Sequence, residues 1–241
     1  MTTRNTDRLA VLIDADNVPA KHAAEIFEEI ATLGEASLRR IYGDFSNGAP
    51  QGWDAKSLAK YAVVAHQQFA NTIGKNSSDI ALVIDAMDIL HSERFSGFVL
   101  VSSDSDFTRL ATRIREQGLD VFGIGERKAP ESLVAACNRF IYIENIKRDT
   151  APCVPAIKDG EAKGKQSLNH AFQLIRNVVN TTNDPDGWAT LPFVERQLGK
   201  IYPDFDPRSY GYTKLSDLVR GLGRFDEADA NGNFRLRYLE K

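Results

Sequence analysis

The chain has 241 residues, of which 42% are hydrophobic and 26% are charged, and its formal net charge is −3. This composition is typical of a globular protein with room for two domains, and the small negative charge means that any nucleic-acid surface must be local. Two cysteines and the lack of a long apolar run argue against a disulfide framework, a membrane span and a signal peptide, so we expect a reduced, cytoplasmic setting.

The first part of the chain alternates short apolar segments with amphipathic ones. Short apolar runs bounded by turn residues predict buried strands, and apolar positions at helical spacing predict helices. The predicted strands are residues 9–13, 37–45, 67–70, 98–101, 120–125 and 139–143. The predicted helices lie between them, with apolar faces within residues 23–30, 58–65, 82–90, 107–114 and 131–137.

Strands that alternate with helices predict a parallel sheet with right-handed crossovers and a layer of helices on each face. All strands of such a sheet end at the same edge, where ligand sites lie. The residues that this rule collects at one edge are Asp14, Asp16, Asp104 and Asp106. For Asp104 and Asp106 the alternative is an acidic helix start, which the helix dipole favours. Their mutual repulsion favours a hard divalent cation between them.

Two further carboxylates lie on the helix predicted after residue 78. Asp79 opens this helix and can face the acidic edge, whereas the helical spacing turns Asp85 about 120° away from it. Asp85 reaches the edge only if the helix slants across it, and the alternative is a half-buried residue bonded to a neighbour. Several carboxylates in one dry pocket cannot all ionise without a cation. Mg²⁺ or Mn²⁺ would remove this repulsion and could activate water for attack on a phosphate.

The basic residues that can approach a phosphate backbone are less informative. Lys75 is the best placed because it precedes Asp79. The alternative for each of the remaining basic residues is an ordinary solvated charge on the surface. These residues are Arg39, Arg40, Lys56, Arg109 and Arg113. Trp53 either stacks on a base or anchors its own loop. The sequence contains no P-loop, no nucleophile elbow and no histidine or cysteine cluster with metal-ligand spacing.

The composition changes after residue 146. Residues 147–166 contain prolines, glycines and several basic residues with few bulky apolar ones, as expected of a linker. Beyond it, helices are predicted over 168–179, 191–198 and 210–222, and Asn231-Gly232 predicts a hairpin. Three helices closed by a hairpin fit a small winged-helix module. We therefore divide the chain into domains at 1–146 and 167–241, joined by the linker at 147–166.

The first domain resembles the NYN family of PIN-like, metal-dependent ribonucleases over residues 9–146. The resemblance rests on the motifs LIDADN, KNSSDIALVID and VLVSSDSDF. It implies a PIN-like α/β/α fold and an Mg²⁺ or Mn²⁺ centre with catalytic ligands at Asp14, Asp79, Asp104 and Asp106, and more weakly at Asp85. Asn17 would give polar support, as would Ser103. The family commonly has a glycine where Ser103 or Ser105 stands, and serine also suits a tight acidic turn.

The C-terminal part resembles an OST-HTH (LOTUS) domain in the segments GWATL and PDFDPRSYGYTKL. This resemblance implies a winged-helix module that binds RNA or a protein partner. Trp188, Phe205 and Tyr212 are either aromatic contacts or core residues. The residues predicted to bind RNA in the whole chain are Arg39, Lys75, Arg208, Tyr210, Lys214, Arg235 and Arg237.

The function predicted from the sequence is metal-dependent hydrolysis of RNA phosphodiester bonds at the acidic edge, aided by an RNA-binding module. A non-catalytic RNA-binding adaptor and a phosphohydrolase acting on small substrates are the alternatives. RNA is the expected partner and a membrane is not, while a protein partner and a homodimer both stay open.

Overall fold

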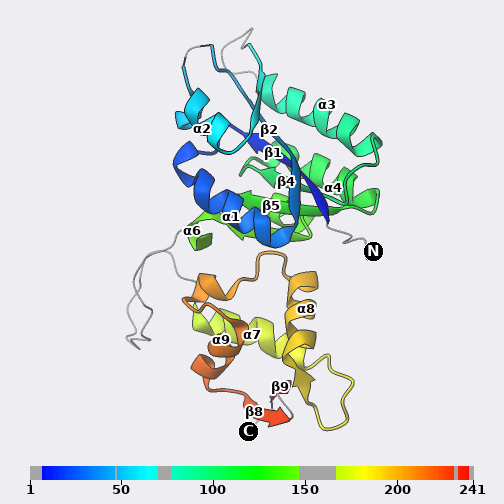
Figure 1. Cartoon of the computed structure of the whole chain (residues 1–241). Coiled ribbons are helices and arrows are strands. Elements are labelled where there is room, and N and C mark those ends of the chain that lie inside the picture. Colours follow the sequence, from blue (N-terminus) through cyan, green and yellow to red (C-terminus); the bar gives the residue numbers. More distant parts are fainter. Residues whose placement is uncertain (1–6, 47, 70–76, 147–166, 231–232, 239–241) are drawn as a thin grey trace, which may run out of the picture. The chain divides into compact units, whose positions relative to one another are not determined.

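The computed structural model describes residues 7–46, 48–69, 77–146, 167–230 and 233–238 (Figure 1). The chain divides into two compact units, residues 1–148 and 149–241. The predicted linker at 147–166 lies outside the described residues. Each unit is described by itself below.

The first unit is built on a six-stranded parallel sheet, as the alternating pattern predicts. Its strands are β1 (Arg8–Asp14), β2 (Glu35–Gly43), β3 (Val64–Gln67), β4 (Gly97–Val101), β5 (Asp120–Gly125) and β6 (Arg139–Tyr142). Their order across the sheet is β3-β2-β1-β4-β5-β6, so the chain first moves outward from β1 and then continues on its other side. The strand order therefore reverses between β1 and β4, and in open α/β sheets ligands bind at the carboxyl ends of the strands at such a point.

Helices cover both faces of this sheet (Figure 1). One face packs against α3 (Ser77–His91), α4 (Thr108–Glu116) and α5 (Glu131–Ala136). The other packs against α1 (Ala23–Leu33), α2 (Ala55–Lys60) and α6 (Ile143–Ile146). Successive residues of a strand point to opposite faces, so Leu12 and Leu100 enter the first core while Ile13 and Val101 enter the second. Burial on both faces explains why β1 and β4 are continuous apolar runs.

Some local predictions differ from the structure in position. The third strand was predicted at 67–70 and lies at Val64–Gln67, and α6 follows β6 without having been predicted. Asp54 caps α2, since its carboxylate accepts the N–H of Ser57 at 2.7 Å. Trp53 is 1% exposed and its Nε1 donates to the carbonyl of Val18 at 2.7 Å, so it anchors the loop rather than offering a surface for stacking.

The second unit has the elements of a winged helix. Its helices are α7 (Leu168–Val179), α8 (Leu191–Ile201) and α9 (Leu215–Leu222), and its antiparallel strands β7 (Ala189–Thr190), β8 (Asp226–Ala230) and β9 (Asn233–Arg237) form a sheet of order β7-β9-β8. The helix predicted over 210–222 is interrupted, because Gly211 has a left-handed φ of 87° and α9 begins only at Leu215. None of the described helices in either unit is long and apolar enough to cross a membrane.

Candidate active site at the carboxyl edge of the sheet

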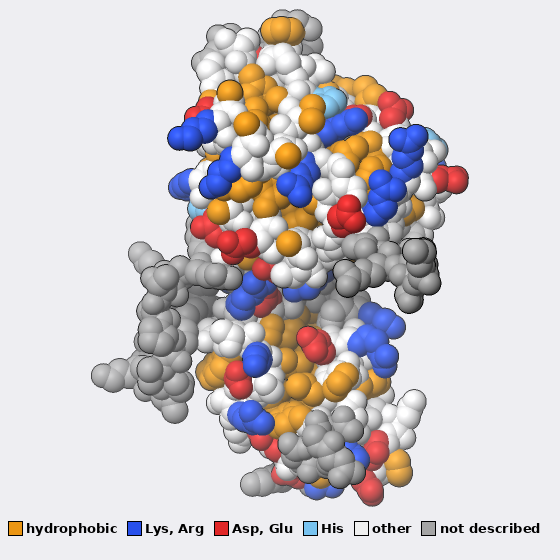
Figure 2. Space-filling model, viewed as in Figure 1, with side chains coloured by type: hydrophobic (Ala, Val, Ile, Leu, Met, Phe, Trp, Pro, Cys, Tyr) orange, Lys and Arg blue, Asp and Glu red, His pale blue; other side chains and the backbone are white. Residues whose placement is uncertain are grey.

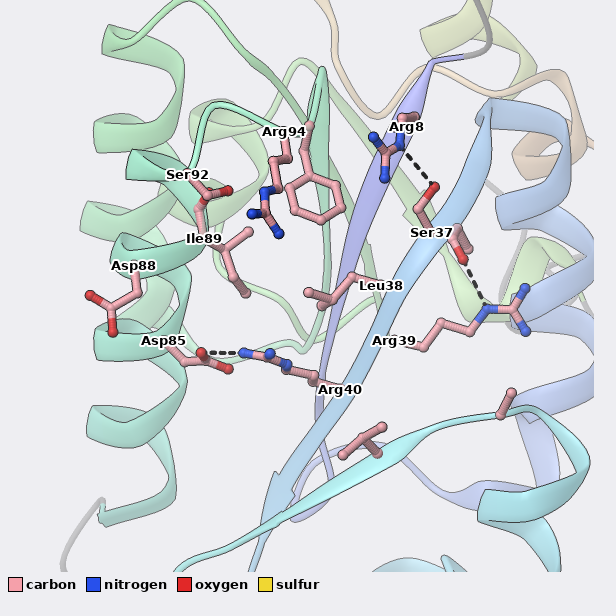
Figure 3. Close-up of a pocket in the computed structure, with 14 residues that line it drawn as sticks. Arg8, Ser37, Leu38, Arg39, Arg40, Asp85, Asp88, Ile89, Ser92 and Arg94 are labelled. Atoms are coloured by element: carbon pink, nitrogen blue, oxygen red, sulfur yellow. Dashed lines mark hydrogen bonds and ion pairs between the residues drawn. The ribbon is translucent and has the colours of Figure 1, made fainter.

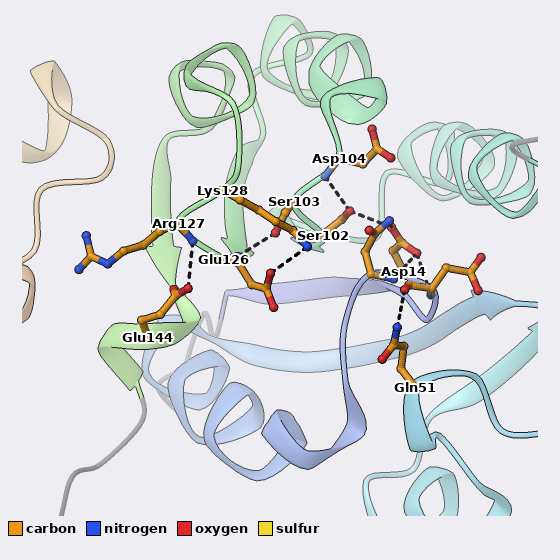
Figure 4. Close-up of polar contacts among 11 residues, drawn as sticks. Asp14, Gln51, Ser102, Ser103, Asp104, Glu126, Arg127, Lys128 and Glu144 are labelled. Atoms are coloured by element: carbon orange, nitrogen blue, oxygen red, sulfur yellow. Dashed lines mark hydrogen bonds and ion pairs between the residues drawn. The ribbon is translucent and has the colours of Figure 1, made fainter. Parts of the chain in front are cut away.

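Asp14 is the last residue of β1 and is buried, with 2% of its surface exposed. Its Oδ2 accepts hydrogen bonds from Asn17 Nδ2 at 2.7 Å and from Ser102 Oγ at 2.8 Å. Its Oδ1 accepts the backbone N–H groups of Asp16 at 3.0 Å and Asn17 at 3.3 Å (Figure 4). Burial raises the pKa of Asp14, and the bonds from Asn17 and Ser102 oppose that rise because they favour the charged form. Asp14 is therefore a fixed carboxylate at the point where the strand order reverses.

Asp104 follows β4, the strand beside β1. Its backbone N–H donates to Ser102 Oγ at 3.1 Å, so Ser102 links the acidic turn to Asp14 (Figure 4). Asp104 Oδ1 accepts the N–H of Asp106 at 2.9 Å, which caps the short 3₁₀ turn Ser105–Phe107. The predicted capping role of this turn is thus present. Within the described residues, the hydrogen bonds of this carboxylate all go to Oδ1, which leaves Oδ2 for a ligand.

Asp79 reaches the same edge from the first turn of α3. The neighbouring Ser78 donates its hydroxyl to Asp16 Oδ2 at 3.0 Å, which ties the start of α3 to the turn after β1. The pKa of Asp79 is raised to about 6, first by burial and then by the negative charges of Asp14, Asp104, Asp106 and Asp16. We call these five aspartates, Asp14, Asp16, Asp79, Asp104 and Asp106, the acidic rim. Folding brings them close enough to repel one another.

The acidic rim offers the oxygen ligands that a hard divalent cation takes. Among the described residues no group of three or more His, Cys, Asp or Glu side chains is arranged to hold a metal ion. Mg²⁺ commonly uses only one or two carboxylates and keeps several waters, so it does not need such a group. After burial, the negative charges of the other four aspartates raise the pKa of Asp79 further, and a cation would relieve this repulsion. The residues present therefore suit a divalent ion that keeps several of its waters, rather than an ion enclosed entirely by protein ligands.

Asp85, predicted as a weaker ligand, lies elsewhere in the structure. Its two carboxylate oxygens are bonded to the Arg40 guanidinium and to the Tyr42 hydroxyl, and His66 Nδ1 lies 4.0 Å from Oδ2. Burial and the bond to Asp85 raise the pKa of Tyr42. The alternative of a half-buried residue bonded to its neighbours is therefore the one seen, and Asp85 fastens α3 to β2.

We expect Asp85→Asn to destabilise the protein without affecting metal binding. Removing the charge weakens two bonds to partly buried groups, at a cost on the order of 1–3 kcal/mol. Urea denaturation measures this loss, and Asp88→Asn on the exposed side of α3 is the matched control. A weaker response to Mn²⁺ in Asp85→Asn than in Asp88→Asn would argue for a ligand role instead.

A groove of about 850 Å³ lies between α3 and β2 (Figure 3). Its lining includes Arg8, Arg40, Asp85, Arg94 and Phe95. Arg8 begins β1, and Arg94 and Phe95 precede β4, so the groove extends toward the amino ends of the strands. None of the five aspartates of the acidic rim lines this groove.

Arg39 and Lys75 are the residues of the first unit that were predicted to bind RNA. Arg39 donates to the carbonyl of Tyr61 at 2.8 Å and lies over the ring of Phe27 at 5.3 Å, so it packs against α1 and α2. Figure 2 shows the basic side chains on the face in view as separate groups, with acidic and uncharged side chains between them. Lys75 lies outside the described residues. Of the two residues predicted to bind RNA in the first unit, the structure describes Arg39, and it contacts α1 and the end of α2.

In the second unit, Arg208 is held by the carboxylate of Asp206 at 2.7 Å, and Tyr210 is 5% exposed and bonded to His170 at 3.0 Å. Both residues therefore have partners inside the unit, and their role in RNA binding stays a prediction. The residues that stay near the surface are Lys214, Arg235 and Arg237. The guanidinium of Arg237 covers the Trp188 ring at 4.6 Å and pairs with Asp226 at 3.1 Å.

Sequence reasoning missed two features of the site. One is Ser102, which bridges Asp14 to the Asp104 turn. The other is the turn after β5, where the N–H of Glu126 donates to Ser103 Oγ at 2.8 Å (Figure 4). Ser103 therefore supports the site through the neighbouring turn. The rule that parallel strands share one edge, applied to β5, was the available signal.

Comparison with known proteins agrees with this architecture. The NYN domain family matches residues 8–144, and the OST-HTH/LOTUS domain matches residues 167–228. No curated protein matches the chain. A crystal structure of a protein of unknown function from Vibrio parahaemolyticus is 22% identical, with a TM-score of 0.50 over 61% of this chain and 98% of that one, which supports the fold alone. A solution structure of an uncharacterized protein from Nitrosomonas europaea is 29% identical over 39% of this chain and 93% of that one, with a TM-score of 0.29.

The NYN match covers more than half of the chain and includes all five aspartates of the acidic rim. The three helices and small sheet of the second unit carry the other match. The chain therefore belongs to the NYN domain family and carries an OST-HTH/LOTUS domain in its C-terminal unit.

Proposed function

We propose that this protein is a ribonuclease that uses Mg²⁺ or Mn²⁺ at the acidic rim to hydrolyse RNA phosphodiester bonds. NYN is a nuclease-type domain and OST-HTH domains bind RNA, so the chain is ribonuclease-like at the level of its domains. The observation that carries the proposal is the gathering of Asp14, Asp79 and Asp104, from three distant segments, at the point where the strand order reverses.

The chain's own residues would divide the work at this edge. Asp79 and Asp104 would hold the ion together with Asp14, and Asp106 is the remaining ligand candidate. Asn17 and Ser102 keep the Asp14 carboxylate oriented. A bound divalent ion would supply neutralising charge, activation of water and stabilisation of the charge that develops on the phosphate.

The second unit would hold the RNA near the nuclease domain. A tethered RNA-binding module raises the local concentration of the substrate without any new contact at the rim. The domain boundaries at 146 and 167, a cytoplasmic location, a protein partner and a homodimer stay predictions. A non-catalytic adaptor that binds RNA through the OST-HTH/LOTUS unit is the second candidate.

Cleavage of a labelled single-stranded RNA by the full chain tests the proposal. We expect cleavage with Mn²⁺ or Mg²⁺, complete loss with EDTA, and recovery when Mn²⁺ is added in excess, because the carboxylates need the ion to act. Gel analysis of the products measures all three. Cleavage that persists in EDTA contradicts the proposal, and RNA binding without cleavage in either metal favours the adaptor.

A further inference from the structure

Where the structure describes them, the turns at the carboxyl edge of the sheet carry mostly acidic or uncharged residues. These turns connect the end of a strand to the next helical residue, and their described residues are 15–19, 44–46, 48–49, 68–69, 102–104 and 126–130. Within these ranges the basic residues are Arg127 and Lys128. A phosphodiester strand that approaches the acidic rim meets a repulsive field, which nearby fixed cations must offset. These two residues are therefore the first candidates for contact with the RNA backbone.

The turn that carries them is held against the acidic turn. Glu126 donates its N–H to Ser103 Oγ, directly before Asp104 in the chain. At Gly125 an added Cβ would lie 2.6 Å from the carbonyl oxygen of Ser102 and 2.9 Å from Ser103 Oγ, so the backbones are in close contact there. The position of residues 126–130 relative to Asp104 is thus set by backbone packing.

The two basic side chains take different directions. Arg127 Nη2 donates to Asn145 Oδ1 at 2.8 Å, and its guanidinium lies over the Tyr142 ring at 5.1 Å. Lys128 is 63% exposed along its side chain, and its Nζ lies 2.9 Å from Glu126 Oε2. In the view of Figure 4, Lys128 extends from its turn toward the side on which Ser102 and Asp14 lie, whereas Arg127 extends the opposite way. An exposed ion pair is worth little, so an incoming phosphate can replace Glu126 as the partner of Lys128.

We propose that Lys128 binds a backbone phosphate of single-stranded RNA and holds the strand beside Asp104. The catalytic consequence rests on the proposed nuclease function, but the binding itself does not. Lys21, the next basic residue in chain order after the β1 turn, lies in the 3₁₀ turn Ala20–His22 before α1 and is the alternative contact.

Lysine acetylation of the full chain tests the contact directly. The Asp104→Asn protein is treated with an amine-reactive acetylating ester in Mg²⁺, with and without a single-stranded RNA oligonucleotide, and peptide mass spectrometry follows each lysine. We expect saturating RNA to slow acetylation of Lys128 severalfold, while Lys60 at the end of α2 reacts at the same rate. Unchanged reactivity of Lys128 in the RNA complex, or protection of Lys21 instead, overturns the proposal.

Kinetics give a second measurement. Lys128→Gln should lower kcat/KM for RNA cleavage about tenfold and reduce the logarithmic salt dependence by about one unit, as expected for one lost phosphate contact. Lys128→Arg should retain most of the activity because it keeps the charge, and Lys60→Gln is the control. Wild-type kinetics in Lys128→Gln at all salt concentrations would contradict the proposal. If the wild type cleaves no RNA in any metal, the nuclease function fails, and the acetylation experiment still decides the role of Lys128.

Discussion

Replacing Asp104 by asparagine is expected to reduce RNA cleavage by about a thousandfold and to leave RNA binding almost unchanged. The substitution removes Oδ2, the carboxylate oxygen that makes no hydrogen bond to the described residues, and asparagine is a weak ligand for a hard cation. Loss of several kcal/mol of charge stabilisation corresponds to roughly this factor, at about 1.36 kcal/mol per tenfold in rate.

The fold should tolerate this change. Asparagine is as good a helix cap as aspartate, so its Oδ1 can still accept the N–H of Asp106. Single-turnover cleavage and RNA binding are measured side by side on the full chain. Asp120→Asn, at the exposed start of β5, is purified in the same way as a control for contaminating nuclease. Equal cleavage by Asp104→Asn and Asp120→Asn would place the chemistry outside the acidic rim.

The edge that carries the site was predictable from the sequence because it follows from strand direction. Asp14 and Asp104 each follow a continuous apolar run, and parallel strands end at one edge whatever their order. The sequence does not tell that β1 and β4 are neighbours, because strand order is decided by packing across the whole sheet. The register that pairs Ile13 with Val101, and so brings Asp14 within reach of Ser102, comes only from the structure.

The polar partners of side chains far apart in sequence could not be predicted. Helical spacing correctly turned Asp85 away from Asp79, but its partners Arg40 and Tyr42 lie more than forty residues earlier, in β2. Tyr210 was predicted to bind RNA from its basic surroundings, whereas packing of the second unit buries it against His170. Pairings of this kind depend on how elements dock, which a local pattern does not contain.

Replacing Asp79 by asparagine is expected to stabilise the metal-free protein at pH 7.5. The pKa of Asp79 is about 6 in the folded protein, above its usual value of 3.8. Because the pKa is higher in the folded than in the unfolded protein, folding favours the protonated form of Asp79. As the pH rises through about 6 the folded protein loses this proton, and the free energy of unfolding falls. Near neutral pH the charged Asp79 therefore opposes folding, and asparagine removes that cost. With the discount for partial exposure, we expect a gain on the order of 1 kcal/mol.

Urea denaturation in EDTA at pH 7.5 and pH 4 measures this effect, and the gain should nearly vanish at the lower pH, where the folded wild type is already protonated at Asp79. Added Mn²⁺ should reverse the ranking at pH 7.5, because an ion that binds only the folded state stabilises it and the wild type keeps the ligand. Protons compete with the ion, so this stabilisation should weaken below about pH 6.

Asp88→Asn, on the same helix but away from the rim, should behave as wild type throughout. Equal stabilisation of wild type and Asp79→Asn by Mn²⁺ would exclude Asp79 as a ligand, and a destabilised Asp79→Asn in EDTA at pH 7.5 would show that its charge is already compensated without a metal.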